Sequence, residues 1–327
     1  MRILVTGGCG FIGSHFVKRL VSVGDEVVVL DKLTYSGNRA NLAGVECELV
    51  QGDIADPEAV EQAGRGCRAV VNVAAESHVD RSILAAGDFI RTDVYGTTVL
   101  LEWARLGGAR FLQVSTDEVY GDVPLGMSSR EDDPLRPSSP YSAAKAGGDL
   151  QVLAYVRTYG LHASITRGAN TYGPNQYPEK LIPLFVTNAL DGQPLPLYGD
   201  GRQRREWLHV DDHCSAVELV LREGKLGTVY NIGGDERENL EIVDRIVELT
   251  GASPALVRHV QDRPGHDRRY SLDSSRLRAL GWAPRRELEE GLAETVAWYR
   301  DNRTWWEPIK SGEYLDYYRR QYADRLA

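Results

Sequence analysis

Ile-Leu-Val-Thr-Gly-Gly-Cys-Gly-Phe-Ile-Gly occupies residues 3–13 of the chain and decides its fold. The apolar run Ile3–Thr6 predicts a buried strand, and a helical pattern follows over Phe11–Val23. Three glycines stand between strand and helix at a spacing of three: Gly7, Gly10 and Gly13. Glycines in such a turn let the backbone approach a ligand closely, and the unpaired N–H groups of the helix N-terminus favour a pyrophosphate. The stretch therefore predicts the opening unit of a dinucleotide-binding fold.

The first half of the chain alternates short apolar runs with helical patterns. Further buried strands are predicted at Val27–Leu30, Glu48–Gln51, Ala69–Val73 and Phe111–Ser115. Further helices are predicted near Pro57–Ala63 and Phe89–Arg105. Parallel strands that are covered by helices on both faces read as continuous apolar stretches, as these do. The alternation predicts an α/β protein with a doubly wound parallel sheet of the Rossmann type.

An acidic residue ends the second predicted strand, since Asp31 stands 18 residues after Gly13. A carboxylate at this place bonds the ribose hydroxyls and repels a 2′-phosphate, so the pattern predicts NAD rather than NADP. The neighbouring Lys32 would soften that preference slightly. Asp53 and Ile54 follow the third strand, where an adenine edge would be read. The alternatives are a nucleotide-binding fold without redox chemistry, or tight turns that bind no ligand.

The pattern loosens after about residue 170, where loops rich in Gly, Pro and Tyr separate shorter helices. Such loops commonly carry ligand contacts on a rigid scaffold. We predict an NAD-binding domain over residues 1–171 and 207–234, and a smaller, mostly C-terminal substrate-binding domain over residues 172–206 and 235–327. The aromatic tail, which includes Trp305, Trp306 and Tyr322, is interpreted mainly as a docking surface.

Charge and composition exclude several classes of protein. A net charge of −9 argues against a general nucleic-acid binder, because phosphate backbones select basic faces. No apolar run approaches the ~20 residues of a membrane helix, and the first residues read as a strand rather than a signal peptide. We therefore expect a cytoplasmic protein without membrane contact. The four cysteines lie far apart without a CxxC pair, so no metal site is expected.

Two polar groups recur at i and i+4 in Tyr141-Ser-Ala-Ala-Lys145, on one face of a predicted helix. A lysine beside a tyrosine favours the phenolate and is expected to lower the pKa of Tyr141. The phenolate could then take the proton of a sugar hydroxyl as hydride leaves the same carbon. The alternative is a pair of residues on the surface of a helix, because YxxxK occurs often by chance.

The stretch Ser115-Thr-Asp-Glu118 follows the fifth predicted strand, whose carboxyl end should face the ligand crevice. Thr116 can donate a hydrogen bond to the reacting hydroxyl. Asp117 and Glu118 are two carboxyl groups that a simple oxidation would not need. Eliminating water requires both an acid and a base, and carboxyls in different environments can hold different protonation states. The alternative is a solvated acidic turn.

Five stretches resemble the dTDP-glucose 4,6-dehydratases, a family of extended short-chain dehydrogenases/reductases. They are Ala74-Ala-Glu-Ser-His-Val-Asp-Arg-Ser82, Ser115-Thr-Asp-Glu-Val-Tyr-Gly121, Pro140-Tyr-Ser-Ala-Ala-Lys-Ala146, Pro178-Glu-Lys-Leu-Ile-Pro183 and Asp262-Arg-Pro-Gly-His-Asp-Arg-Arg-Tyr270. The similarity runs over nearly the whole chain. Its most specific part is the Thr-Asp-Glu triplet, at which related sugar epimerases look different.

The resemblance implies a role for each matching residue. Asp117 would donate a proton to the C6 oxygen, Glu118 would be the base at C5, and Tyr141 would be the base for the C4 hydroxyl, assisted by Thr116. Lys145 would hold Tyr141 and the nicotinamide ribose, so Tyr141 and Lys145 are also matching cofactor positions. Further matching cofactor positions are Phe11, Ile12, Asp31, Lys32, Leu33, Thr34, Asp53, Ile54, Val73, Ala74, Ala75, Ser77, Thr92 and Thr171. Matching substrate positions are Ser77, Thr116, Asn170, Lys180, Leu181, Pro196, Leu197, Tyr198, Arg205, Asn239, Arg263, His266 and Tyr322. Arginine forks suit the pyrophosphate.

The reaction that the resemblance implies converts dTDP-D-glucose to dTDP-4-keto-6-deoxy-D-glucose and water. It consists of oxidation at C4, elimination across C5–C6 and hydride return to C6, all on one bound NAD. The resemblance also implies a homodimer, formed through the helices near Phe89–Arg105 and Tyr141–Tyr159. The alternatives are a UDP-sugar 4-epimerase or decarboxylase, or a non-catalytic NAD-binding regulator.

Two positions depart from the family pattern. The family usually has Asn-Asn-Tyr-Gly where this chain has Asn170-Thr-Tyr-Gly173. It also commonly has Asn after the threonine that matches Thr92, and here that residue is Asp93. Both positions are expected near the nicotinamide half of the cofactor.

Overall fold

The computed structural model describes residues 1–326, with the side chains described through Tyr322 except at residue 313. Its main feature is a seven-stranded sheet in the order β10-β6-β5-β4-β1-β2-β3, in which all neighbouring strands pair in parallel. The strands are β1 (Arg2–Thr6), β2 (Glu26–Asp31), β3 (Glu48–Gln51), β4 (Ala69–Asn72), β5 (Arg110–Thr116), β6 (Ala163–Gly168) and β10 (Val229–Ile232). The prediction of a doubly wound parallel sheet is confirmed, and β6 and β10 add two strands to the five that were predicted.

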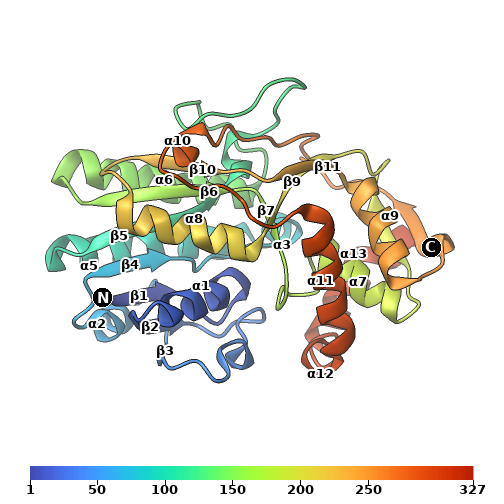
Figure 1. Cartoon of the computed structure of the whole chain (residues 1–327), viewed down its shortest axis with the longest axis horizontal. Helices are drawn as coiled ribbons and strands as arrows, with labels where there is room; N and C mark the ends of the chain where they lie inside the picture. The colour runs from blue at the N-terminus through green and yellow to red at the C-terminus, as the bar shows by residue number, and fades with distance from the viewer. Residues whose placement is uncertain (327) are drawn as a thin grey trace.

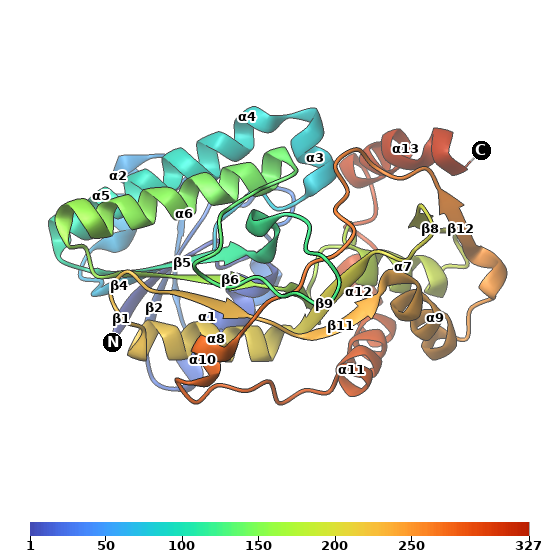
Figure 2. The ribbon, with the colours of Figure 1, turned by 90° about the horizontal axis from the view of Figure 1, so that it is seen from above.

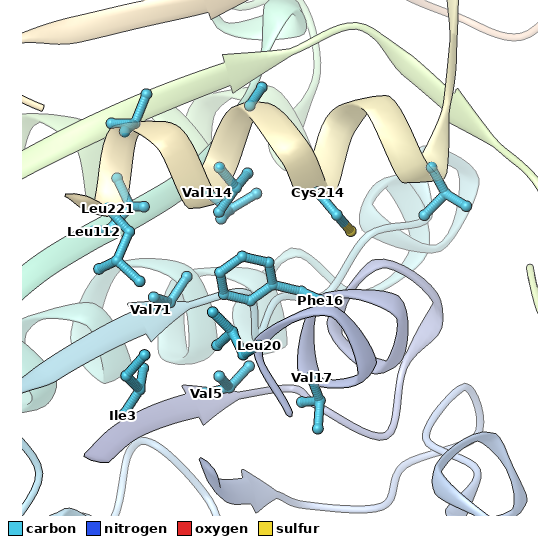
Figure 3. Packing of buried hydrophobic residues seen from close by; sticks show 14 of the residues in the cluster. Ile3, Val5, Phe16, Val17, Leu20, Val71, Leu112, Val114, Cys214 and Leu221 are labelled. Carbon is cyan, nitrogen blue, oxygen red and sulfur yellow. The ribbon is translucent and has the colours of Figure 1, made fainter. Parts of the chain in front are cut away.

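Helices cover both faces of the sheet (Figures 1 and 2). One face carries α2 (Pro57–Gly64), α5 (Thr97–Gly107) and α6 (Pro140–Tyr159), and the other carries α1 (Phe11–Ser22) and α8 (Val210–Glu223). Because each strand is apolar on both sides, each layer of helices encloses its own core. Figure 3 shows one of these cores, in which Phe16 and Leu20 of α1 lie among Val5 of β1, Val71 of β4 and Cys214 of α8.

The helix predicted near Phe89–Arg105 is longer and less regular than the sequence suggests. It consists of α4 (Ala86–Phe89), a π-helical segment η2 (Ile90–Gly96) and α5. Two glycines of α6 lie against the π-helical segment: a Cβ on Gly148 would come within 2.6 Å of the Asp93 carbonyl oxygen, and one on Gly147 within 2.9 Å of Val94. Short π-helical segments are frequent at functional sites. The close contact fixes the Asp93 backbone against α6.

A smaller group of elements follows the parallel sheet, on the right of Figures 1 and 2. It contains a three-stranded sheet of β7 (Asn170–Tyr172), β9 (Arg204–His209) and β11 (Asp235–Glu238), and a parallel pair of β8 (Leu195–Tyr198) and β12 (Val257–Val260). Its helices are α7 (Leu181–Leu190), α9 (Asn239–Thr250), α11 (Leu288–Asp301), α12 (Arg303–Trp306) and α13 (Glu313–Leu326). The short helices α3 (Val79–Leu84) and α10 (Ser275–Arg278) belong to the connections. The predicted boundaries between two domains remain a prediction.

The aromatic tail packs into the interior of its own chain. Trp306 is fully buried, and Tyr314 and Tyr322 are 3% and 5% exposed within the core that α7, α9 and α11 share. The interpretation of the tail as mainly a docking surface is therefore wrong for these side chains. The rings bury more apolar area than short loops could, so they complete a core that the small sheets leave open. Within residues 1–326, no helix has both the length and the apolar character needed to cross a bilayer.

Candidate active site

A cavity of about 320 Å³ lies along the carboxyl edge of the parallel sheet. Its walls come from the segments that follow β1 to β6, and the strand order reverses between β1 and β4 at this edge, which is where open α/β sheets bind ligands. Predicted cofactor residues in the wall are Gly7, Gly10, Phe11, Ile12, Gly13, Asp31, Lys32, Thr34, Asp53, Ile54, Val73, Ala74, Ala75, Ser77, Thr92 and Thr171. The wall also contains Thr116, Asp117, Glu118, Tyr141, Lys145, Asn170, Lys180 and Leu181. The structure thus brings the predicted cofactor and catalytic residues together.

The glycine turn forms one end of the cavity. Gly7 has φ +66°, and a Cβ there would come within 2.7 Å of the Ala74 backbone. A Cβ on Gly13 would lie 2.1 Å from the Gly7 carbonyl oxygen, so α1 could not start this close to β1 with any larger residue. The open backbone and the N-terminus of α1 fit the pyrophosphate of a dinucleotide.

Asp31 lies at the end of β2 and lines the same cavity. Its carboxylate accepts the backbone N–H of Cys9 at 2.8 Å and that of Leu33 at 2.7 Å, which fixes its orientation. Burial raises the pKa of Asp31, and these two hydrogen bonds oppose the rise. Leu33 itself does not line the cavity: it has φ +56° and its side chain packs against the core. Its part in this site is the N–H that holds Asp31.

Lys32 points its charge at Asp53, because its ammonium lies 2.9 Å from Asp53 Oδ2. The pKa of Asp53 is lowered by the hydrogen bonds from Ala55 and Lys32, which outweigh its partial burial. The ion pair with Asp53 partly neutralises the positive charge of Lys32 that could attract a 2′-phosphate. The structure therefore gives Lys32 less influence on the choice between NAD and NADP than the sequence suggested.

Thr116 and Asp117 lie where β5 ends, with both side chains buried. Thr116 Oγ1 donates to Asp117 Oδ1 at 3.1 Å, and Asp117 Oδ2 has no hydrogen-bond partner among the described residues. Burial raises the pKa of Asp117 to about 8, and the nearby carboxylates of Glu118 and Glu206 add to the rise while Arg205 opposes it. Asp117 therefore keeps its proton at neutral pH and can act as an acid.

Glu118 occupies a different electrostatic environment. Burial also raises the pKa of its carboxyl, but three cations favour the ionised form: Arg263, Lys180 and Arg205. Asp117 mainly faces other carboxylates, so the two neighbours differ in the charges around them. The alternative of a solvated acidic turn is wrong, because Asp117 is only 3% exposed. The pair suits an acid and a base that work side by side.

Tyr141 and Lys145 lie on the first turns of α6. The Ser139 side chain accepts the N–H of Ser142 and caps the helix, which begins at Pro140. Tyr141 is 8% exposed and Lys145 is 3% exposed, so the alternative of a surface pair is wrong. Capping fixes the helix start and therefore the direction in which both side chains enter the cavity.

The expected fall in the pKa of Tyr141 is not found in the chain itself. Burial and the charges of Glu118 and Asp93 raise its pKa well above the usual value, and a hydrogen bond with Thr116 opposes the rise. Lys145 is directed elsewhere: its ammonium donates to the Val114 carbonyl oxygen at 2.9 Å and lies 3.6 Å from Asp93 Oδ1. The prediction considered Lys145 alone, whereas the fold surrounds Tyr141 with three carboxyl groups, since Asp117 also contributes.

Thr171, which departs from the family pattern, contacts His213, a residue that was not predicted from the sequence. Thr171 Oγ1 lies 2.6 Å from His213 Nδ1, and both side chains line the cavity. Burial lowers the pKa of His213 to about 4, so its imidazole is neutral. His213 Nε2 has no hydrogen-bond partner among the described residues. Sequence reasoning missed His213, although its position in the first turn after β9 could have indicated it.

Lys180 and Ser77 both line the cavity, and the Lys180 ammonium donates to the Ser77 carbonyl oxygen. The adjacent Glu179 is buried and accepts the Tyr35 hydroxyl at 2.9 Å and the Arg81 guanidinium at 3.0 Å. Sequence reasoning also missed Glu179, which ties the loop after β2 to the segment before α7. Other cavity residues that it missed include Gln176, Tyr177 and Trp207.

The remaining predicted substrate residues, the second group, do not line that cavity. They are Pro196, Leu197, Tyr198, Arg205, Asn239, Arg263, His266 and Tyr322. Tyr198 connects several of them, because its ring lies 6.0 Å from that of His266 and 6.1 Å from that of Tyr322. Arg263 is electrostatically coupled to Glu118, which links this group to the acidic pair.

In two members of this group, the side chain is already occupied by contacts within the protein and is not free for a direct contact with a ligand. Leu197 is 1% exposed and its side chain belongs to the core, which leaves only its backbone for a ligand. The Arg205 guanidinium donates to the carbonyl oxygens of Arg204, Arg268 and Asp267 and lies over the Tyr270 ring. Arg263 is less engaged, because its Nη1 lies 3.5 Å from Asp80 and its Nε has no hydrogen-bond partner among the described residues.

The geometry agrees with the relatives of this chain. A family profile described as GDP-mannose 4,6 dehydratase matches residues 4–295. The dTDP-glucose 4,6-dehydratase of Streptomyces niveus is 56% identical over 326 residues, covering 95% of this chain and 96% of that protein. The chain belongs to the dTDP-glucose 4,6-dehydratase family. The dTDP-glucose 4,6-dehydratase of Mycobacterium tuberculosis H37Rv is 48% identical over 98% of this chain and 99% of that protein.

Solved structures place this dehydratase-family chain among NAD-binding enzymes. The dTDP-glucose 4,6-dehydratase DesIV of Streptomyces venezuelae, solved with NAD bound, has a TM-score of 0.92 and 55% identity, covering 95% of this chain and all of that one (100%). A UDP-glucose 4-epimerase of Thermus thermophilus in complex with NAD has a TM-score of 0.88 and 35% identity over 92% of this chain and 100% of that one. The fold is thus shared by two different reactions, and the residues of the site must distinguish them.

Proposed function

We propose that this protein converts dTDP-D-glucose to dTDP-4-keto-6-deoxy-D-glucose and water with a bound NAD. The observation that carries this proposal is the pair of neighbouring carboxyls in the cavity wall at the end of β5, of which Asp117 is buried beside other carboxylates and Glu118 faces three cations. An epimerase would have no elimination to catalyse and no use for such a pair. The family and the names of its most similar relatives support the same reaction.

The residues that would hold NAD line one continuous cavity. Gly7, Gly10 and Gly13 would receive the pyrophosphate, Asp31 the adenine-side ribose, and Asp53 and Ile54 the adenine. The steric fit of the glycine turn supports this, because a Cβ on Gly7 or Gly13 would collide with neighbouring backbone. When bound, NAD supplies reversible hydride transfer to and from the sugar.

Thr116, Tyr141 and Lys145 would serve the redox step at C4. Tyr141 takes the proton of the C4 hydroxyl and passes it on to solvent, because C4 remains a ketone in the product, and the Thr116 hydroxyl hydrogen-bonds the same C4 oxygen. Lys145 holds a positive charge next to the end of β5, where its ammonium is fixed by the Val114 carbonyl oxygen. The charge favours the phenolate form of Tyr141 against the nearby carboxylates.

Asp117 and Glu118 would carry out the elimination. The 4-ketone makes the C5 proton acidic, and Glu118 removes it, because three cations oppose the rise that burial causes in its pKa. Glu118 returns a proton to C5 when hydride enters C6. Asp117 gives its proton to the departing C6 hydroxyl, which its raised pKa of about 8 allows at neutral pH. Closing the cavity around these groups would protect the unsaturated intermediate from water.

Product analysis tests the reaction directly. Purified protein is incubated with dTDP-glucose and, in parallel, with UDP-glucose, and the products are identified by mass and by NMR of the sugar. We expect loss of one water and a 4-keto-6-deoxy product from dTDP-glucose. A galactose epimer or a decarboxylated sugar as the main product would replace the dehydratase proposal by one of its alternatives.

The protein would act as a cytoplasmic homodimer. Large apolar side chains are exposed along the π-helical segment, α5 and α6, which supports an interface there. They are Ile90 at 58%, Tyr95 at 49%, Leu106 at 71%, Leu150 at 57% and Tyr159 at 56% exposure. Light scattering during size exclusion tests this proposal, and a monomer at micromolar concentration would exclude it.

A further inference from the structure

Asp93 is a buried carboxyl group at the edge of the active site. It lies in the π-helical segment η2, is 1% exposed, and neither of its carboxylate oxygens has a hydrogen-bond partner among the described residues. The Lys145 ammonium is its nearest described countercharge, at 3.6 Å from Oδ1. An ionised carboxylate without partners is costly to bury, so the position of Lys145 decides whether the charge can exist there.

The backbone around Asp93 allows little relaxation. Gly148 of α6 lies so close to the Asp93 carbonyl oxygen that a Cβ would approach to 2.6 Å. The adjoining carboxyl of α6, Asp149, is already paired with Arg167 at 2.8 Å. Asp93 is therefore the main carboxyl group that balances the charge of Lys145.

We propose that Asp93 is a positioning residue that holds the Lys145 ammonium and, through its own charge, sets the pH at which Tyr141 exchanges its proton. This proposal rests on the proposed function of Tyr141 as the base at C4. Asp93 does not contact the reacting atoms itself. Asp93 acts indirectly: it offsets the charge of Lys145, and the charges of Asp93 and Lys145 together change the electrostatic potential at the Tyr141 phenol.

The charged groups around Asp93 set the sign of this effect. Lys145 and Tyr141 face it from α6, and Glu76 faces it from the segment after β4. Two charged residues close to Asp93 in the sequence, Asp88 of α4 and Arg91 of η2, are exposed to solvent. Burial and the charge of Glu76 raise the pKa of Asp93 to about 7, and Lys145 and the backbone N–H of Glu76 oppose the rise. Asp93 thus changes its charge within the neutral range.

Ionised Asp93 raises the pKa of Tyr141, because its negative charge disfavours the phenolate. Replacing the carboxyl by an amide of the same shape removes this charge at every pH. The acid limb of kcat/KM, which reports the deprotonation of the base, should then move to lower pH. A nearby charge commonly shifts a pKa by about one unit or more, so we expect a displacement of roughly one pH unit.

The experiment compares the wild type, Asp93→Asn and Asp88→Asn from pH 5.5 to 9.5 with dTDP-glucose as the substrate. Asp88→Asn is the matched control, since it makes the same chemical change on the adjoining helix in a solvent-exposed position. We expect the acid limb to move for Asp93→Asn and to stay for Asp88→Asn. Coincident profiles of the wild type and Asp93→Asn would overturn the proposal.

Thermal unfolding of the same proteins gives a readout that does not depend on turnover. A carboxyl whose pKa is raised on folding from about 4 to about 7 loses its stabilising contribution as the pH rises through that window. The Tm of Asp93→Asn relative to the wild type should therefore increase between pH 5 and pH 8, and that of Asp88→Asn should not. A constant difference would show that Asp93 does not titrate in this window and would also overturn the proposal.

A second neutral variant, Asp93→Ser, covers the case in which Asp93→Asn does not fold, and it is read in the same way. The two proposals fail separately. Absence of a 6-deoxy product from the wild type would overturn the proposed function, while the unfolding comparison would still test the pairing of Asp93 with Lys145. A normal product with unchanged pH profiles would overturn the role of Asp93 alone.

Discussion

Thr116 Oγ1 donates a hydrogen bond of 3.1 Å to Asp117 Oδ1, while Asp117 Oδ2 has no hydrogen-bond partner among the described residues. The bond orients the carboxyl at the end of β5 and leaves its second oxygen available to a ligand. Thr116 also opposes the rise in the pKa of Tyr141, so the same side chain influences the proposed acid and the proposed base of the redox step.

The double variant Asp117→Asn with Glu118→Gln should separate oxidation from elimination. Both amides keep the size of the carboxyls but cannot transfer a proton, whereas Thr116, Tyr141 and Lys145 are unchanged. We expect absorbance of reduced nicotinamide on mixing with dTDP-glucose, with 6-deoxy product nearly abolished. Solvent deuterium should enter C5 in the wild type and hardly at all in the variant. Dehydration at close to the wild-type rate would mean that the pair has no part in proton transfer.

The raised pKa of Asp117 predicts an alkaline limit to activity. Asp117 must carry a proton to act as an acid, and its pKa of about 8 means that the proton is lost as the pH rises through that value. We expect kcat/KM for product formation to fall above about pH 8, about tenfold for each further pH unit. A profile that stays flat to pH 9.5 in matched ionic strength would contradict the assignment.

Tyr141→Phe should remove the base at C4 and leave the ring in place. Positioned acid–base groups contribute ~10²–10⁴-fold, so kcat should fall by that order while KM changes little. Steady-state kinetics checks the loss, and the thermal unfolding temperature checks that the variant is folded. Tyr159→Phe is a suitable control, because that ring is exposed at the far end of α6. Near-normal turnover of Tyr141→Phe would place the base elsewhere.

Asp80→Asn should weaken substrate binding more than chemistry. Asp80 is 5% exposed, accepts the Tyr198 hydroxyl at 3.0 Å and lies 3.5 Å from Arg263, so it orients two predicted substrate residues. Hydrogen bonds to charged groups are worth ~1.5–3 kcal/mol, which predicts a rise in KM of about tenfold or more. A loss confined to kcat, measured by the same product assay, would argue against this role.

The protein should retain NAD through purification. Asp31 at the end of β2 disfavours a 2′-phosphate, and Lys32 is paired with Asp53 rather than left to attract one. Denaturing the purified protein and identifying the released nucleotide by mass should yield NAD. Release of NADP would show that the ribose site is read differently. Asp31→Ala should lower the NAD content, because the ribose hydroxyls lose their acceptor.

Local patterns were enough to predict the first half of the sheet. The predicted strands at Ile3–Thr6 and Glu48–Gln51 agree with β1 and β3 to within one residue, and the helix predicted at Pro57–Ala63 is α2. Strand and helix periodicities, glycine turns and strand-end acidic residues are properties of neighbouring residues, so they can be read from the sequence alone. The Thr116–Asp117–Glu118 segment was predictable for the same reason, as it follows a strand.

The chain by itself determined the parallel sheet, the glycine turn and the identity of the acidic and YxxxK groups, because each is encoded by residues that are adjacent or one helical turn apart. Only the tertiary structure decided how these groups are charged. Lys145 and Asp93 come from different helices, and His213 reaches Thr171 from the helix after β9. Burial and long-range Coulomb interactions set a pKa, and both depend on which segments fold against each other rather than on sequence spacing. The rise in the pKa of Tyr141 could therefore not be read from Lys145 in the sequence, since the opposing carboxyl groups are brought to it only by the fold.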